Sequence, residues 1–188
     1  MNAVPICRII TVQTFRGERT LTFRKRLFGA LDDERNGRGP GPSGTDCLLF
    51  MGHTGVSSDA GKVIYGFNPD GGTDPIWKMM QRLRNGGAYP GIVRDDSAVF
   101  TAAQQRGLMV LRFEIALSPP GFQSFRRKLA AELRHSKHSY GFPDGDGDCN
   151  CTTWMERLGL PLLTGRMDEF TAVSGVTAQR RRRFGECL

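Results

Sequence analysis

The chain has 188 residues, the length of a single compact domain, and its 39% hydrophobic and 24% charged residues are typical of a globular protein. It contains no run of about 18 apolar residues, so we expect no stable membrane insertion. The net charge of +7 favours anionic partners. Its sharpest basic cluster, Arg180 to Arg183, lacks interleaved aromatic residues, so we interpret it as a solvated end and expect no nucleic-acid partner.

The N-terminal segment 1–20 lacks a basic stretch followed by an apolar one, so we expect synthesis in the cytoplasm without a signal peptide. The five cysteines form an odd set without the spacing of a disulfide framework. This usage suits a reducing compartment and leaves at least one thiol unpaired. One of the cysteines is therefore a candidate for chemistry.

The first part of the chain predicts strands and one hairpin. Short strands are expected at Ile9 to Val12 and at Leu21 to Phe23, and the Gly- and Pro-rich segment from Glu34 to Thr45 predicts a loop. The apolar run CLLFMGHTGV, the turn residues SSDAG and the run KVIYGF together predict a β-hairpin over about 47–68. His53 would lie on the first strand of this hairpin.

The middle of the chain predicts two helices and a strand. A helix is expected from Asp74 to Arg84, with Asp74 as its cap, followed by a loop over 85–97. A strand is expected from Leu108 to Leu117, and a helix from Phe122 to Leu133, where apolar residues recur at helical spacing. The composition of the next segment, 135–148, predicts a loop.

A helix carrying a cysteine is expected after this loop. Helical spacing returns from Cys151 to Leu158, and Gly159 and Pro161 end the helix. The exposed amides at a helix N-terminus stabilise a thiolate and can also bind an oxyanion. Cys151 is therefore a candidate nucleophile, with a histidine on a neighbouring strand, His53, as the group that takes and returns its proton.

Four segments in order resemble the circularly permuted branch of the papain-like NlpC/P60 superfamily, in which the histidine hairpin precedes the cysteine helix. GHTGVSSDAGKVIYGFNPDGG resembles the histidine hairpin, and PGIVRDDS resembles the loop after it. VLRFEIALSPPGFQSFRRKLAAEL resembles the strand and helix ahead of the nucleophile, and NCTTWMERLGLP resembles the nucleophile segment. Together these segments cover roughly residues 47–161.

The resemblance also implies roles for individual residues. The pattern Asn-Cys-x-x-aromatic selects Cys151 over Cys149 as the nucleophile, although Cys149 stands where the family commonly has another polar residue. A third residue should orient His53. The position implied for it is Tyr65, and the uncertain register of the turn leaves Asn68 as the alternative. Tyr140 lies in the region from which related enzymes bring a tyrosine hydroxyl to the oxyanion.

No metal or other cofactor is expected. Asp144, Asp146 and Asp148 imitate the start of a calcium-binding loop, but Met155 stands at the twelfth position, where a bidentate carboxylate is needed. A zinc site built from Cys149, Cys151, His135 and His138 matches no common spacing and would occupy the nucleophile.

We therefore predict a single papain-like domain over 1–188 of the α+β class, with an antiparallel sheet of about four to six strands packed against the helix of Cys151, about 151–159. The predicted activity is that of a cysteine peptidase or amidase that forms a thioester acyl-enzyme. The resemblance implies peptide or cell-wall substrates, delivery between bacteria by a dedicated secretion system, and an immunity protein as partner. An acyltransferase, deamidase or lipid-directed hydrolase of the same fold, or a lapsed basic binding module, are the alternatives.

Overall fold

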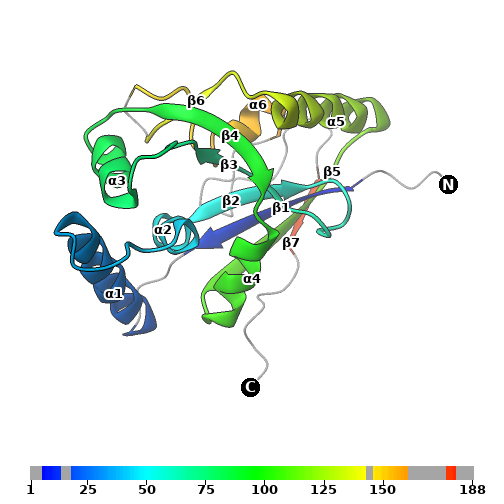
Figure 1. Ribbon diagram of the computed structural model, residues 1–188. Helices are drawn as coiled ribbons and strands as arrows, with labels where there is room; N and C mark the ends of the chain where they lie inside the picture. Colours follow the sequence, from blue (N-terminus) through cyan, green and yellow to red (C-terminus); the bar gives the residue numbers. More distant parts are fainter. Residues whose placement is uncertain (1–5, 14–17, 143–145, 161–176, 181–188) are drawn as a thin grey trace.

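The computed structural model describes residues 6–13, 18–142, 146–160 and 177–180, which form a curled antiparallel sheet with helices packed on it (Figure 1). Among these residues the sheet has seven strands in the order β6-β4-β3-β2-β1-β5-β7. The strands are β1 (Ile6–Gln13), β2 (His53–Ser57), β3 (Tyr65–Pro69), β4 (Tyr89–Asp95), β5 (Met109–Ala116), β6 (Ser139–Tyr140) and β7 (Thr177–Arg180). The expected α+β class with an antiparallel sheet is confirmed, and the sheet exceeds the expected four to six strands.

The described helices pack on both faces of this sheet. They are α1 (Glu18–Arg35), α2 (Gly44–Met51), α3 (Ile76–Arg84), α4 (Ser97–Gln105), α5 (Pro119–Arg134) and α6 (Trp154–Arg157). Figure 1 shows α5 and α6 together at one side of the sheet and α2 and α4 at the other. None of these helices is long and apolar enough to cross a membrane.

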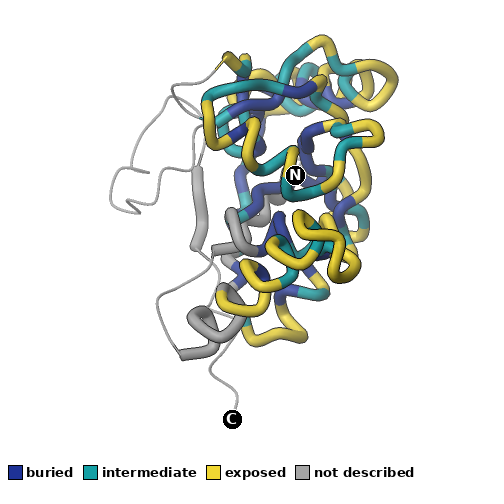
Figure 2. Tube along the Cα trace, turned by 60° about the vertical axis from the view of Figure 1, so that its left-hand side comes forward, coloured by how far each residue is buried: buried dark blue, intermediate teal, exposed yellow. Residues whose placement is uncertain are grey.

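Two hydrophobic clusters follow from the alternation of side chains along the strands. Phe67 of β3 packs with Trp154 and Phe125 in the cluster beneath α5 and α6. The neighbouring Gly66 faces the other way, because a Cβ built there would meet His53 and Asp96. On that second face α2 and α4 form a smaller cluster that includes Phe100. Buried residues accordingly follow the strands, and the outer sides of the helices are exposed (Figure 2).

The segment before His53 differs from its prediction. Cys47 to Met51 belong to helix α2 and are not part of a strand. A capping box explains the helix, because Ser43 accepts a hydrogen bond from the N–H of Asp46 while the Asp46 carboxylate accepts one from the N–H of Ser43. Gly52 follows with φ of +79°, a conformation that favours glycine. The chain therefore passes from α2 into β2 at one residue, and His53 becomes the first residue of its strand.

Two further segments were predicted wrongly. Residues 89–95, expected in a loop, form β4, which pairs with β3 through Gly66↔Arg94 and Phe67↔Val93. Pro90 and Gly91 obscured this strand, but the Phe67 ring occupies the space beside Gly91 that a side chain would fill. Leu21 to Phe23, expected in a strand, lie in α1.

Other expected elements are confirmed with shifted ends. Ile9 to Val12 lie in β1, and the strand expected from Leu108 is β5. The helix expected from Phe122 is α5, which begins earlier because Ser118 caps it and two prolines fill its first turn. Helix α3 is present, but Asp74 does not cap it and instead binds Lys78 and Tyr89.

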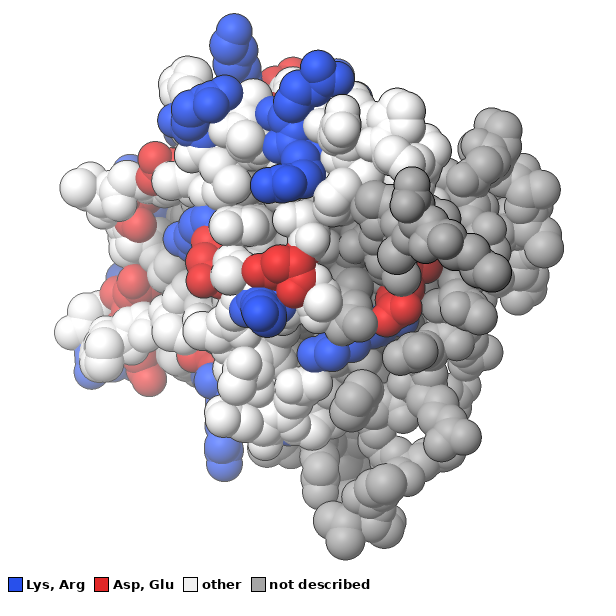
Figure 3. Space-filling view, turned by 90° about the vertical axis from the view of Figure 1, so that its right-hand side faces the viewer, with Lys and Arg blue, Asp and Glu red and all other residues white. Residues whose placement is uncertain are grey.

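Acidic and basic side chains are intermixed over the centre of the face shown in Figure 3, and Lys and Arg gather at its upper edge. The described part of this face is therefore not one uniformly basic surface. Residues 181–183 of the basic cluster considered above lie outside the described residues.

Candidate active site

His53 and Asp96 form a buried pair at the start of β2. The ring atom Nε2 of His53 lies 2.7 Å from Asp96 Oδ2, and the two residues expose 1% and 2% of their surface. Asp96 is fixed between β4 and α4, since its N–H donates to the carbonyl of Ile64 and its carbonyl accepts from the N–H of Val99. The third residue of the site is therefore an aspartate that the sequence analysis did not select.

The Cys151 thiol is the second side chain that acts on the imidazole. Asp96 occupies Nε2, so Nδ1 is the ring atom left for Cys151, and it has no partner that meets ordinary hydrogen-bond geometry among the described residues. The contact with the thiol is thus a loose one, as is common in unliganded active sites. The predicted meeting of His53 and Cys151, almost a hundred positions apart in the chain, is found in the structure.

The pKa values of the two groups move toward an imidazolium and a thiolate. Burial alone would lower the pKa of His53, but hydrogen bonds with Asp96 and Cys151 outweigh it and raise this pKa to about 9. Burial alone would raise the pKa of Cys151, but His53, through hydrogen bonding and charge, and the backbone N–H of Thr54 bring it below its ordinary value. The arrangement therefore favours proton transfer from sulfur to nitrogen.

A break in the sheet lets the sulfur reach His53. The ladder between β2 and β3 consists of Gly55↔Gly66 and Val56↔Tyr65 and does not continue to the start of β2. The N–H of Thr54 is thus free of that ladder and donates toward Cys151. The Thr54 hydroxyl lies 3.1 Å from the hydroxyl of Thr152, which ties the cysteine turn to β2.

Cys151 lies in a turn ahead of α6 and not inside the expected helix. Helix α6 spans only Trp154–Arg157, and residues 151–153 are a turn. Asn150 organises this turn, because its Oδ1 accepts the backbone N–H groups of Thr152 and Thr153 at 2.9 and 3.0 Å. A helix of one turn has a weak dipole. The low pKa of Cys151 thus comes from His53 and the Thr54 amide, which corrects the reason given from the sequence.

The Tyr140 hydroxyl lies near Cys151. Burial and the charge of Cys151 raise the pKa of its hydroxyl well above the ordinary value, while the backbone N–H of Cys151 acts in the opposite direction. The hydroxyl is thus close enough to feel both the sulfur and the amide of Cys151. Its ring is held by Phe67, with centroids 5.6 Å apart. Two donors therefore converge next to the nucleophile.

Tyr65 does not orient His53. It precedes Gly66 on β3 and so points to the opposite face, where it packs against the cluster of Phe67. Asn68, the alternative, lies on the correct face but its Nδ2 donates to Asp96 Oδ2 at 2.7 Å and to the carbonyl of Gly66, not to the imidazole. The signal for Asp96 was the sequence RDDS ahead of an apolar segment, which is typical of a helix start.

Cys149 is a poor nucleophile. Burial raises the pKa of its thiol to about 12, and the nearby Asp148 adds to this increase. Its backbone pairs with β6, where its carbonyl accepts the N–H of Gly141 and its N–H donates to the carbonyl of Ser139. The selection of Cys151 over Cys149 thus agrees with the environment of both thiols.

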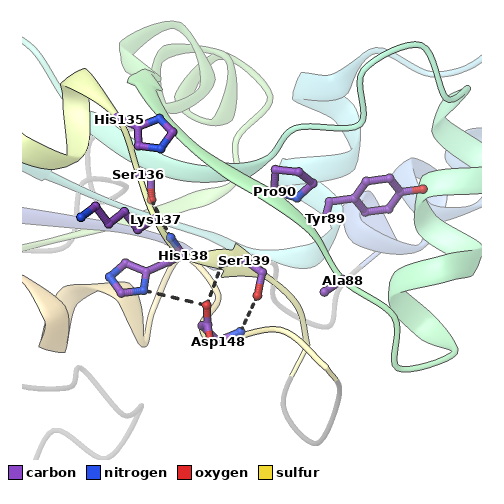
Figure 4. Close-up of a pocket in the computed structure, with 9 residues that line it drawn as sticks. All are labelled: Ala88, Tyr89, Pro90, His135, Ser136, Lys137, His138, Ser139 and Asp148. Carbon is purple, nitrogen blue, oxygen red and sulfur yellow. Dashed lines mark hydrogen bonds and ion pairs between the residues drawn. The ribbon is translucent and has the colours of Figure 1, made fainter.

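A cavity of about 560 Å³ opens along β6, where Ser139, the residue before Tyr140, lines it (Figure 4). The start of β4 forms one wall, and the segment after α5 forms the other. Its lining residues are Ala88, Tyr89, Pro90, His135, Ser136, Lys137, His138, Ser139 and Asp148. Asp148 is three residues before Cys151, so their Cα atoms are at most roughly 11 Å apart. No group of three metal-binding side chains occurs in the described part of the chain.

Comparison with known proteins gave no match: no family model fits the chain, and no curated protein or solved structure matches it.

Proposed function

We propose that the protein is a papain-like cysteine hydrolase that cleaves an amide or ester bond through a thioester at Cys151. The observation that carries this proposal is the buried series Cys151–His53–Asp96 with the Tyr140 hydroxyl beside the sulfur. A nucleophile, a base with an orienting acid, and an oxyanion donor are the parts that acyl transfer requires. The order of histidine before cysteine in the chain supports the permuted NlpC/P60 type.

The reaction begins with attack of the Cys151 thiolate on the substrate carbonyl, which forms the S–C bond and a tetrahedral oxyanion. The Tyr140 hydroxyl and the Cys151 amide donate to this oxyanion. His53 then gives its proton to the leaving amine or alcohol as the C–N or C–O bond breaks. In the second half His53 takes a proton from water, the hydroxide attacks the thioester, and the acid product leaves as Cys151 regains its starting form.

Substrate would be held partly in the cavity along β6. A volume of about 560 Å³ lies within the usual range of binding sites. An extended peptide rises roughly 3.3 Å per residue, so a residue about three positions from the cleaved bond would reach this cavity. Peptides of the bacterial cell wall are the proposed substrates, with delivery by a secretion system and an immunity protein as partner.

Labelling with iodoacetamide at pH 7, followed by peptide mapping, tests the thiol. Cys151 exposes only 6% of its surface, so a small electrophile is the appropriate probe. We expect Cys151 to be labelled faster than Cys149 and Cys47, and His53→Ala to slow its labelling. Arg84→Ala, which changes an exposed residue of α3 outside the cavity, is the control and should have no effect. Equal, slow labelling of all the cysteines would favour a lapsed binding module.

Export to the bacterial periplasm tests the substrate class. We expect the wild-type chain to lyse cells and Cys151→Ala to leave them intact at the same expression level. Rapid labelling of Cys151 without lysis or altered cell-wall peptides would retain the hydrolase and reject the cell-wall substrate.

A further inference from the structure

Asp96 accepts three side-chain hydrogen bonds, more than the orientation of an imidazole requires. His53 Nε2 and Asn68 Nδ2 each lie 2.7 Å from Asp96 Oδ2, and Arg94 Nε lies 3.3 Å from Oδ1. A buried carboxylate is stable only when such donors replace its water. The donors come from three neighbouring strands, β2, β3 and β4.

Asn68 fixes the direction of the carboxylate. Its side chain is fully buried, and its Nδ2 also donates to the carbonyl of Gly66 at 3.1 Å. Both neighbours of Nδ2 are acceptors, so the opposite orientation of the amide would bring oxygen against oxygen. The amide thus has one acceptable orientation, in which it holds Oδ2 between itself and the ring of His53.

Arg94 supplies charge to the same carboxylate from the solvent side. Half of its side chain is exposed, while Asp96 is buried. The other acid at this point, Asp95, is occupied by the N–H and hydroxyl of Ser97. The ring that α4 packs against His53 is the uncharged Phe100, with centroids 5.8 Å apart. Arg94 is therefore the permanent positive charge that the described structure places on Asp96.

Gly66 provides the space for this arrangement. A Cβ at this position would overlap both Asp96 Oδ2 and His53 Nε2. The hydrogen bond between acid and ring therefore runs directly over the Cα of Gly66, and any larger residue would separate the pair. The sequence YGFNP thus supplies both the gap, Gly66, and the donor, Asn68, two positions apart on the same face of β3.

We propose that Asn68 and Arg94 are positioning residues that act on His53 through Asp96, Asn68 by aiming the carboxylate and Arg94 by keeping it ionised, in the space left by Gly66. This inference rests on the proposed function, because its effect is read at the Cys151 thiolate. The two residues have different signatures. Loss of the hydrogen bond that orients Asp96 lowers the labelling rate of Cys151 at pH 7, whereas loss of the charge of Arg94 only allows protonation of Asp96 at a higher pH.

The test is the pH profile of iodoacetamide labelling of Cys151 in the full chain, from pH 4 to pH 9. We expect Arg94→Gln to move the acidic midpoint upward by about half a pH unit and to leave the plateau unchanged, because a half-exposed charge is partly screened. Arg94→Lys, which keeps the positive charge, should return the acidic midpoint most of the way to its wild-type value. Arg84→Gln, which changes an exposed arginine on α3, is the matched control.

The second arm uses Asn68→Ala and Gly66→Ala, with thermal melting to confirm folding. We expect Asn68→Ala to lower the labelling rate at pH 7 about tenfold, with a smaller deficit at pH 9, where the thiol ionises without the help of His53. Gly66→Ala should lower the rate at pH 7 further, and Gly44→Ala, at a position with open space, should not.

If the variants at the buried positions do not fold, Arg94→Gln still tests the proposal, because the Arg94 side chain is half exposed and its replacement should not disturb folding. An unchanged midpoint in Arg94→Gln would overturn the role of Arg94. A labelling rate at pH 7 that is unchanged in folded Asn68→Ala would overturn the role of Asn68. Slow labelling of wild-type Cys151 would instead reject the proposed function and this inference with it.

Discussion

Cys149 and Cys151 are two residues apart and similarly buried, but their surroundings shift the pKa of the two thiols in opposite directions. They expose 5% and 6% of their surface, so access to solvent does not distinguish them. Burial raises the thiol pKa at both positions, to about 12 at Cys149. At Cys151, however, His53 and the Thr54 amide overcome burial and lower the pKa. The comparison shows that neighbouring charges and hydrogen-bond donors make a buried thiol reactive, whereas burial itself does not.

The largest expected difference comes from removal of each sulfur. We expect Cys151→Ala to abolish acyl-enzyme formation with p-nitrophenyl acetate and Cys149→Ala to keep it, because only one thiol has a base. Intact-mass spectrometry after brief mixing measures the acetylated fraction. Acetylation that persists in Cys151→Ala and disappears in Cys149→Ala would reverse the assignment.

Tyr140→Phe separates acyl transfer from simple thiol reactivity. The carbonyl reaction develops an oxyanion and alkylation does not, so loss of one donor should slow acylation by roughly 100-fold to 1,000-fold. Labelling by iodoacetamide should change much less. The ratio of the two rates, measured on the same preparation, is the readout. Equal loss of both rates would show that Tyr140 only maintains the structure around the sulfur.

His53→Ala should make Cys151 resemble Cys149. Without the imidazole, burial remains the main influence and the pKa of Cys151 rises above its ordinary 9.0. A thiol with the ordinary pKa of 9.0 is about 1% ionised at pH 7, and one with a higher pKa is ionised less, so labelling should fall at least about 100-fold. Stopped-time alkylation at pH 7 and pH 9.5 measures this change. The labelling rates of the wild-type chain and of His53→Ala should converge at high pH. A deficit of the variant that persists there would point to misfolding.

The pH dependence of turnover sharpens the same comparison. His53 must be protonated to release the leaving group, and its pKa is raised to about 9. Turnover should therefore decline as pH rises through about 9, by about tenfold per pH unit, because the imidazolium is lost. At low pH it should decline when Cys151 and Asp96, whose pKa values are both lowered, become protonated. Hydrolysis of an amide substrate, whose amine leaving group needs the proton, followed from pH 5 to pH 10.5 would show both declines, and a flat profile above pH 9 would exclude His53 as the acid.

Much of the fold was accessible from local sequence. The strand β5 and the helix α5 follow from apolar periodicity and from the prolines between them. The segment ahead of His53 was misassigned because its apolar run CLLFM lacks a distinguishing period, and the Ser43–Asp46 capping box decided for a helix. The pairing of His53 with Cys151 was expected from the order of motifs, not from periodicity.

The third residue was missed for a geometric reason. Tyr65 was selected by its distance along the chain from His53, but its neighbour Gly66 faces the histidine, so Tyr65 faces away. Asp96 lies 43 positions from His53 and beyond an unrecognised strand, β4. Without that strand nothing in the local pattern brings the two residues together. The role of Asn68 likewise became visible only once Asp96 was in place.

The sequence by itself determined which groups are available: a cysteine after Asn150, a histidine after Gly52, and glycines where the chain must turn or leave space. The tertiary structure decided which of them act together. Strand pairing sets which face each side chain points to, and the short ladder between β2 and β3 opens the place where Cys151 meets His53. The pKa of each thiol then depends on charges brought by distant segments, which no local pattern can specify.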